Sequence, residues 1–190
     1  MFGKRMKALS RVLFLAVFMT LGVCLLFTGC STAQKQLDPS VTAPQVIVNP
    51  DSIRLGVAKV TGTDIVFEGS GFEAGDAVFI ALVGPEDTEV AIADGRVGED
   101  GTFKAPVGPL GKVTGILRAT VSGNYKEDGS YNQYVVLTQD PIPTGTYTVV
   151  ATGMLSDQTA KTQMEIKRPG IGDRFKDFLG KKMGKIQDKR

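Results

Sequence analysis

The chain has 190 residues, a formal net charge of +2, no histidine, no tryptophan and two cysteines. Because histidine is the commonest metal ligand and the usual general base near neutral pH, its absence excludes most zinc sites and much of acid–base catalysis. No serine stands beside a partner base that could activate it. The sequence therefore predicts neither an enzyme nor a cofactor.

The first 29 residues have the layout of an export signal. Residues 12–27 are almost wholly apolar and are followed by the small Thr28 and Gly29. An uncleaved transmembrane anchor is the alternative, because the apolar stretch is nearly long enough to span a bilayer. We favour a cleaved leader over residues 1–29, since the stretch stops at small residues directly before Cys30. Basic residues precede the stretch at Lys4, Arg5, Lys7 and Arg11.

The segment Leu26-Phe27-Thr28-Gly29-Cys30 resembles the lipobox of bacterial lipoproteins. That family prefers leucine three residues before the cysteine, where this chain has Phe27. The resemblance implies that a signal peptidase recognises the four residues before Cys30. It also implies that Cys30 gains a diacylglycerol and an acylated amine, so that the membrane is a partner through this lipid.

The residues around the lipidated cysteine bear on location. Ser31 implies, by the same resemblance, transfer to the outer membrane if the host has one, facing the periplasm or the surface. Cys24 leaves with the leader, so we expect a mature chain with no disulfide and no thiolate metal site. The expected location is the cell envelope.

The rest of the chain divides into three parts. Residues 30–45 are polar and contain prolines, which predicts a flexible tether. Residues 46–167 are short apolar runs broken by Gly, Asp and Pro, which predicts one antiparallel all-β sandwich. Residues 168–190 form a tail with eight basic and three acidic residues, whereas the domain before it is acidic. The strands are predicted near residues 65–68, 77–83, 90–93, 102–105, 116–121, 134–138, 147–151 and 162–166.

Three motifs carry a second resemblance. The sequence GSGFEAGD at 69–76, EDGTF at 99–103 and GTYTVVATG at 145–153 resemble the conserved corners of bacterial immunoglobulin-like domains. The resemblance implies an immunoglobulin-like β-sandwich over 46–167. It also implies a tyrosine corner, in which the Tyr147 phenol bonds back to nearby backbone. Residues 106–143 exceed what the family needs and predict one extra hairpin.

Two features of the domain allow a binding function. The acidic turns at 99–103 and 127–131 could hold calcium, but no spaced series of oxygen ligands accompanies them, so we favour Asp-Gly hairpin turns and expect no metal. Tyr125, Tyr131 and Tyr134 gather in the inserted hairpin. They form a candidate binding surface for a sugar or a protein, or simply a cross-strand aromatic pair at the turn.

The tail predicts a basic amphipathic helix. Its apolar residues recur at helical spacing, and its lysines gather towards the end, which suits the helix dipole. Gly180 and Gly184 weaken the helix, so it needs a surface to pack on. That surface is the protein's own domain, a membrane or a partner groove, and the pattern does not separate them. The predicted apolar face consists of Phe175, Phe178, Leu179, Met183 and Ile186.

Together these features predict a lipid-anchored envelope protein with a non-catalytic binding or accessory role, in adhesion or in an envelope assembly. The partner would be an envelope protein or a polysaccharide, and we expect no nucleic acid. The alternative is a structural spacer that positions the basic tail helix on a membrane or an envelope polymer.

Overall fold

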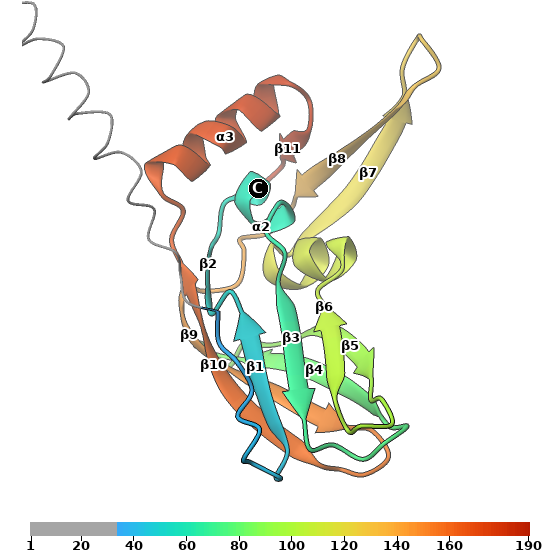
Figure 1. The fold of residues 1–190 in the computed structure, drawn as a ribbon. Coiled ribbons are helices and arrows are strands. Elements are labelled where there is room, and N and C mark those ends of the chain that lie inside the picture. Colours follow the sequence, from blue (N-terminus) through green and yellow to red (C-terminus); the bar gives the residue numbers. More distant parts are fainter. Residues whose placement is uncertain (1–33) are drawn as a thin grey trace, which may run out of the picture. The chain divides into compact units, whose positions relative to one another are not determined.

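The computed structural model describes residues 34–190, and these residues form three sheets (Figure 1). The first sheet has the order β1 (Gln45–Asn49), β3 (Val66–Ser70), β6 (Phe103–Pro106). The second has the order β2 (Ser52–Arg54), β10 (Thr159–Lys167), β9 (Gly145–Gly153), β4 (Ala77–Val83), β5 (Glu89–Arg96). The third has the order β11 (Ile186–Asp188), β8 (Tyr131–Leu137), β7 (Ala119–Tyr125). Helical segments are α2 (Val57–Thr61), a π-helical turn (Gly111–Ile116) and α3 (Ile171–Lys182).

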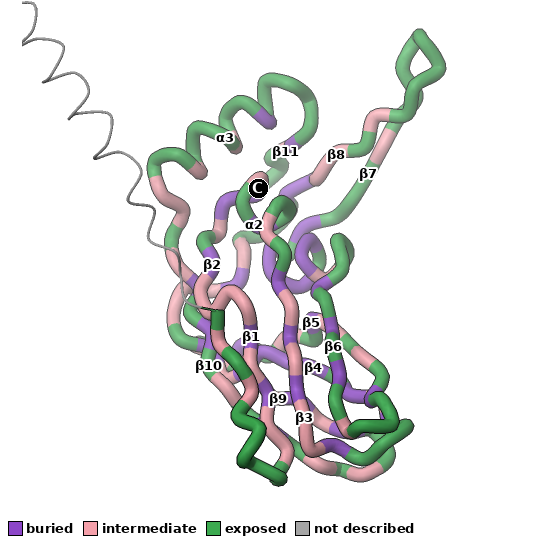
Figure 2. The backbone as a smooth tube through the Cα atoms, viewed as in Figure 1, coloured by how far each residue is buried: buried purple, intermediate pink, exposed green. Residues whose placement is uncertain are grey.

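One hydrophobic core joins the first two sheets. Side chains alternate along β9, so that Tyr147, Val149 and Ala151 point inward. Phe67 on β3 and Ile80 on β4 meet them from the first sheet and from the neighbouring strand. Buried positions alternate along the strands of both sheets and continue to the root of the β7–β8 hairpin, whereas the tip of this hairpin is exposed (Figure 2). The all-β class predicted from the sequence is confirmed.

Each of the eight predicted strands overlaps an observed one, and residues 77–83 match β4 in full. β4 lies between β9 and β5, as expected of a central strand. The sequence pattern did not indicate β1, β2, α2, the π-helical turn or β11. All five are short, with at most six residues each, so no sustained periodic pattern develops in them.

Residues 34–44, within the segment predicted as a tether, contain no helix or strand. Lys35 exchanges hydrogen bonds with the Asn49 side chain, at 2.9 and 3.1 Å. Asp38 does the same with the Gln45 side chain, at 3.0 and 2.7 Å. This part of the chain therefore lies against β1.

The glycine-rich motif at 69–76 makes a tight corner after β3. A Cβ at Gly69 would overlap the Phe103 ring, and Gly71 adopts a φ of 79° with Ala43 against it. Phe72 packs edge-to-face on Phe103, with ring centroids 5.2 Å apart. Glycine is needed here because a side chain would meet both the strained backbone and the aromatic pair.

Asp76 closes the motif as a buried carboxylate. It accepts hydrogen bonds from the backbone N–H groups of Ala77 and Leu155, at 2.6 and 3.0 Å, and from the Ser156 hydroxyl at 2.7 Å. These bonds tie the start of β4 to the turn between β9 and β10. The Ser156 hydroxyl, with help from the backbone donors, lowers the pKa of Asp76 below its usual value.

Asp76→Ala will lower the urea midpoint of unfolding at neutral pH, because it leaves the turn's backbone donors without their acceptor. Since the folded pKa is lowered, the carboxylate stabilises the fold above its ordinary pKa of about 4, and this contribution is lost as the pH falls through the folded value. The difference between wild type and Asp76→Ala should therefore shrink in acid. Asp94→Ala, at an exposed site on β5, is the control and should leave the midpoint nearly unchanged. Equal midpoints for Asp76→Ala and wild type at neutral pH would contradict the assignment.

Candidate functional site

The tail and the inserted hairpin form one structural unit. β11 pairs in parallel with β8, with Ile186 opposite Val135 and Asp188 opposite Leu137. The backbone N–H groups of Val135 and Lys189 donate across this ladder, at 3.0 and 2.9 Å. The hairpin's root is buried at Ala119, Val136 and Leu137. The sequence left three surfaces open for the tail: its own domain, a membrane or a partner groove. The end of the chain packs on its own domain.

Two glycines make this return possible. Gly184 has a φ of 68°, and the Lys185 and Gly184 N–H groups donate to the carbonyls of Gly180 and Lys181, at 2.8 and 3.1 Å. This is the Schellman pattern that ends a helix. Gly180 is the buried residue of α3 and leaves room for Ile186, whose side chain a Cβ there would approach to 2.7 Å. The glycines thus end the helix and turn the chain back.

The predicted apolar face of the tail helix is wrong at its end. α3 stops at Lys182, Met183 is its C-cap residue, and Ile186 lies on β11 with its side chain buried. The physical reason is the turn at Gly184, which reverses the chain before another helical turn forms.

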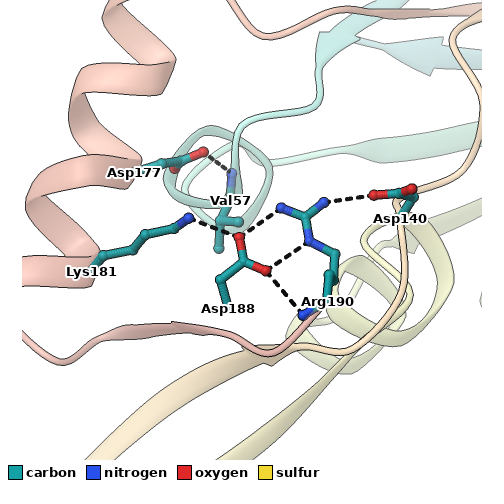
Figure 3. A network of polar contacts seen from close by, with 6 residues as sticks. All are labelled: Val57, Asp140, Asp177, Lys181, Asp188 and Arg190. Carbon is teal, nitrogen blue, oxygen red and sulfur yellow. Dashed lines mark hydrogen bonds and ion pairs between the residues drawn. The ribbon is translucent and has the colours of Figure 1, made fainter.

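α3 meets the domain through its polar edge. The Asp177 carboxylate accepts hydrogen bonds from the Val57 and Ala58 N–H groups at the start of α2, at 3.0 and 2.9 Å. Figure 3 shows the bond from Val57. These are first-turn donors that have no partner within a helix. Asp173 accepts from the N–H of Gly170, at 2.9 Å, and so caps its own helix. Both acidic residues of α3 are thereby held in backbone contacts.

A cluster of charges fastens the last residues (Figure 3). Asp188 accepts from Arg190 and from Lys181, at 2.8 Å each, and Arg190 also reaches Asp140 at 2.9 Å. The Arg190 and Lys181 hydrogen bonds hold the pKa of Asp188 far below its usual range. Because these groups are partly open to solvent, water and salt screen the pairs, and they orient the end of the chain more than they stabilise the fold.

Three residues of the predicted face, Phe175, Phe178 and Leu179, lie on α3 and are exposed. Phe175 is 60% exposed, Phe178 53%, Leu179 41%, and Ile171 at the helix start 90%. Met183 is exposed as well. We call Ile171, Phe175, Phe178 and Leu179 the outer face of α3. The domain covers the polar edge of this helix and leaves the outer face open.

Two grooves flank α3 where it meets the domain. The larger, of about 460 Å³, lies along Phe178 and Arg174 and is floored by Leu55 and Ile142. The smaller, of about 350 Å³, lies along Leu179 and Met183. Both are open and mostly apolar.

The tip of the inserted hairpin carries two of the three predicted tyrosines. Tyr125 and Tyr131 stand opposite each other across β7 and β8, with ring centroids 5.2 Å apart in an edge-to-face arrangement. They are 76% and 57% exposed. Tyr134 lies three residues further along β8, hence on the other face of the ribbon, where the Ser122 hydroxyl lies 3.4 Å from its own. The structure therefore brings Tyr125 and Tyr131 together and separates Tyr134 from them.

The two acidic turns are alike in structure. Asp100 accepts from the N–H and hydroxyl of Thr102, at 3.1 and 2.8 Å, and Asp128 accepts from Ser130 in the same way, at 2.9 and 2.6 Å. These bonds lower the pKa of both carboxyls. Within residues 34–190, no three acidic, cysteine or histidine side chains gather as a metal site would require.

The predicted lipobox residues, Leu26, Phe27, Thr28, Gly29 and Cys30, lie outside the described residues. In the described part of the chain, none of the helices has the length and apolar character needed to cross a membrane.

Sequence reasoning missed the residues that dock the tail. Asp177 and Arg190 bond to groups that are distant in the sequence, since the Asp177–Val57 contact joins residues 120 positions apart and the Arg190–Asp140 contact residues 50 apart. Asp188 bonds to Lys181 and Arg190, which lie within seven residues of it, but no periodic pattern indicates these pairs. The only local signal was Gly180 with Gly184, which the sequence analysis treated as weakening a helix.

Comparison with known proteins adds little. No protein-family model matches the chain, and no curated protein is significantly similar to it. A solved structure of macromomycin is similar to 65% of this chain, over 99% of its own length, at 13% identity and a TM-score of 0.35. A similarity this weak carries no conclusion about fold or function.

Proposed function

We propose that this is a lipid-anchored cell-envelope protein that binds a partner, without catalysis, through the tip of its inserted hairpin. The observation that carries the proposal is the exposed Tyr125–Tyr131 pair at the end of a ribbon that projects past the two core sheets (Figure 1). Tyrosines are enriched among residues that dominate protein interfaces, because they bury a large area at little entropic cost.

The hairpin combines a fixed root with an open tip. Ala119 and Leu137 are buried at the root, where β11 adds a third strand. The outer halves of both strands are exposed or half-buried. An element held at one end loses less freedom on binding than a loose loop would, which favours affinity. The chemistry of the tip fits an envelope protein, or a polysaccharide whose sugar rings stack on the phenols.

We further propose that residues 46–167 form an immunoglobulin-like sandwich. The strand order supports this: β1, β3 and β6 correspond to strands A, B and E, and β10, β9, β4 and β5 to G, F, C and C′. The Tyr147 hydroxyl donates to the Pro143 carbonyl at 2.8 Å, as in a tyrosine corner. Burial raises the pKa of this phenol. The hairpin is then an insertion between strands E and F.

Site-specific photo-crosslinking tests the hairpin's role. A photoreactive phenylalanine at position 131 of the full chain, in cells, should give a discrete adduct, and Tyr125→Ser should reduce it. The same group at position 155, which is a leucine 83% exposed in the turn between β9 and β10, is the control and should not give that adduct. Tyr125→Phe should keep the adduct, since it preserves the aromatic pair.

Two results would contradict the proposal. Position 131 could give no adduct in the intact envelope, or positions 131 and 155 could give the same adducts. Digestion of the adduct with proteases or glycosidases distinguishes a protein partner from a polysaccharide.

A further inference from the structure

We infer that α3 is a membrane-surface helix, whose outer face enters the headgroup region of an anionic bilayer while its polar edge stays docked on the domain. The occupant of the outer face is thus a lipid surface. The inference does not depend on the hairpin's partner.

The rotation of α3 turns its apolar side away from the domain. Asp173, Asp177 and Gly180 face the domain and recur every three or four residues along one edge of α3. At 3.6 residues per turn, the outer face of Ile171, Phe175, Phe178 and Leu179 lies on the opposite side. A helix of a water-soluble protein normally turns its apolar stripe towards the core and its polar side outward. Here the arrangement is reversed, so the outer face needs a further surface to cover it.

The exposed charge of α3 is positive. The two carboxylates of α3 are engaged by backbone N–H groups, and Lys181 is paired with Asp188. Arg174, Lys176 and Lys182 on the same helix are exposed. The exposed surface of α3 is therefore apolar and cationic, which complements anionic lipid headgroups.

The position of Lys182 favours a bilayer over a protein surface. Lys182 lies one and two turns after Phe178 and Phe175, within the outer face, with Nζ 5.9 Å from the Phe178 ring centroid. Lysine is depleted from the core of protein interfaces, because burying its charge is costly. At a bilayer its long side chain extends to the headgroups while the neighbouring rings enter the acyl boundary.

The proposed Cys30 anchor, on which this step rests, is only a few residues from the described domain. Four residues from Cys30 to Gln34 span at most about 14 Å. Lys35 pairs with Asp51 at 3.5 Å, just before β2. β2 is three residues long, or about 10 Å. Arg54 is its last residue, and the Nη1 atom of its side chain lies 3.5 Å from the carbonyl oxygen of Arg168, just before α3. The proposed lipid anchor would thus keep the domain, and with it α3, within a short length of chain of the bilayer.

A tryptophan probe tests the inference cleanly, because the chain has no tryptophan of its own. Phe175→Trp is placed in the full chain, which is reconstituted into vesicles with or without anionic lipid. In anionic vesicles its emission should shift to shorter wavelength and be quenched by lipids brominated on the acyl chain. Leu155→Trp, beyond the other end of β10, is the matched control and should keep a water-like emission.

Further variants sharpen the test. Adding Ile171→Glu and Phe178→Glu to the Phe175→Trp chain should abolish the shift, and circular dichroism should stay unchanged because both sites are exposed. High salt should reduce the shift by screening the cations.

Three results would overturn the inference. The Phe175→Trp probe could remain water-like in anionic vesicles, or respond equally in vesicles without anionic lipid. The emission of the probe could also be shifted to shorter wavelength in detergent-free solution without vesicles, while sedimentation gives the mass of a dimer. A second copy of the chain would then cover the outer face. If the proposed lipid anchor is wrong, Cys30 will not incorporate a labelled fatty acid, whatever the Phe175→Trp probe shows. The anchor and the membrane-surface helix can therefore be refuted independently.

Discussion

Cys30→Ser will abolish incorporation of a labelled fatty acid and leave residues 1–29 attached to the protein. Serine lacks the thiol to which the diacylglycerol is joined in bacterial lipoproteins. In that family, the signal peptide is cleaved only after this modification. Mass spectrometry of the purified protein should find the intact N-terminus and no lipid. Cell fractionation alone is not enough, because the uncleaved apolar segment 12–27 would itself hold the protein at a membrane.

Cys24→Ser is the matched control for this experiment. It changes the other cysteine of the chain, six residues earlier in the apolar segment, and should leave labelling and cleavage as in wild type. Persistent labelling of Cys30→Ser, or loss of labelling in Cys24→Ser, would refute the assignment of the anchor to Cys30.

Ile186→Ala will release the tail from the domain. Ile186 is 5% exposed, packs on Gly180 of α3 and stands at the start of the β11–β8 ladder. Removing buried methyl groups of this kind costs about 2–5 kcal/mol. Because β11 is only three residues long, this loss should appear as local opening of the tail while the core stays folded. Hydrogen exchange should accelerate in α3 and β11, about tenfold for each 1.4 kcal/mol lost, and stay unchanged in β9 and β4.

Ile171→Ala is the control of the same chemistry. Ile171 is 90% exposed on α3, so its truncation should change the free energy of unfolding by no more than about 0.5 kcal/mol. It should nevertheless weaken the contact of α3 with anionic vesicles. If both variants exchange alike, the tail is not held by Ile186, and the docking seen in the structure does not govern its stability.

The strands of the domain could be predicted because their signals are local. Residues 77–83 are a continuous apolar run stopped by Gly84-Pro85, and β9 alternates inward and outward side chains. The turns around Gly101 and Gly129 follow from Asp-Gly sequences, and both glycines adopt positive φ. The hairpin was expected because the segment 106–143 is longer than the corresponding segment of the bacterial immunoglobulin-like domains that this chain resembles.

The tail could be predicted only in part. Its apolar spacing indicated a helix, and a helix forms over Ile171–Lys182. The same spacing placed Ile186 on that helix, although the residue lies on β11. Ile186 follows the turn at Gly184, but it stands at the position where a continued helix would also place an apolar residue. The spacing of apolar residues therefore cannot detect this chain reversal. The π-helical turn gave no pattern at all.

The sequence by itself determined the all-β class, the position of most strands and the helical tail, because each depends on neighbours within a few residues. It also predicts the anchor at Cys30 from local residues. Only the tertiary structure decided that the tail returns to pair with the inserted hairpin and that α3 turns its apolar face outward. These features depend on Asp177 meeting α2 and on Ile186 meeting β8 and Gly180. The pattern of a helix states which side is apolar, but the direction in which that side points is set by contacts between residues far apart in the chain.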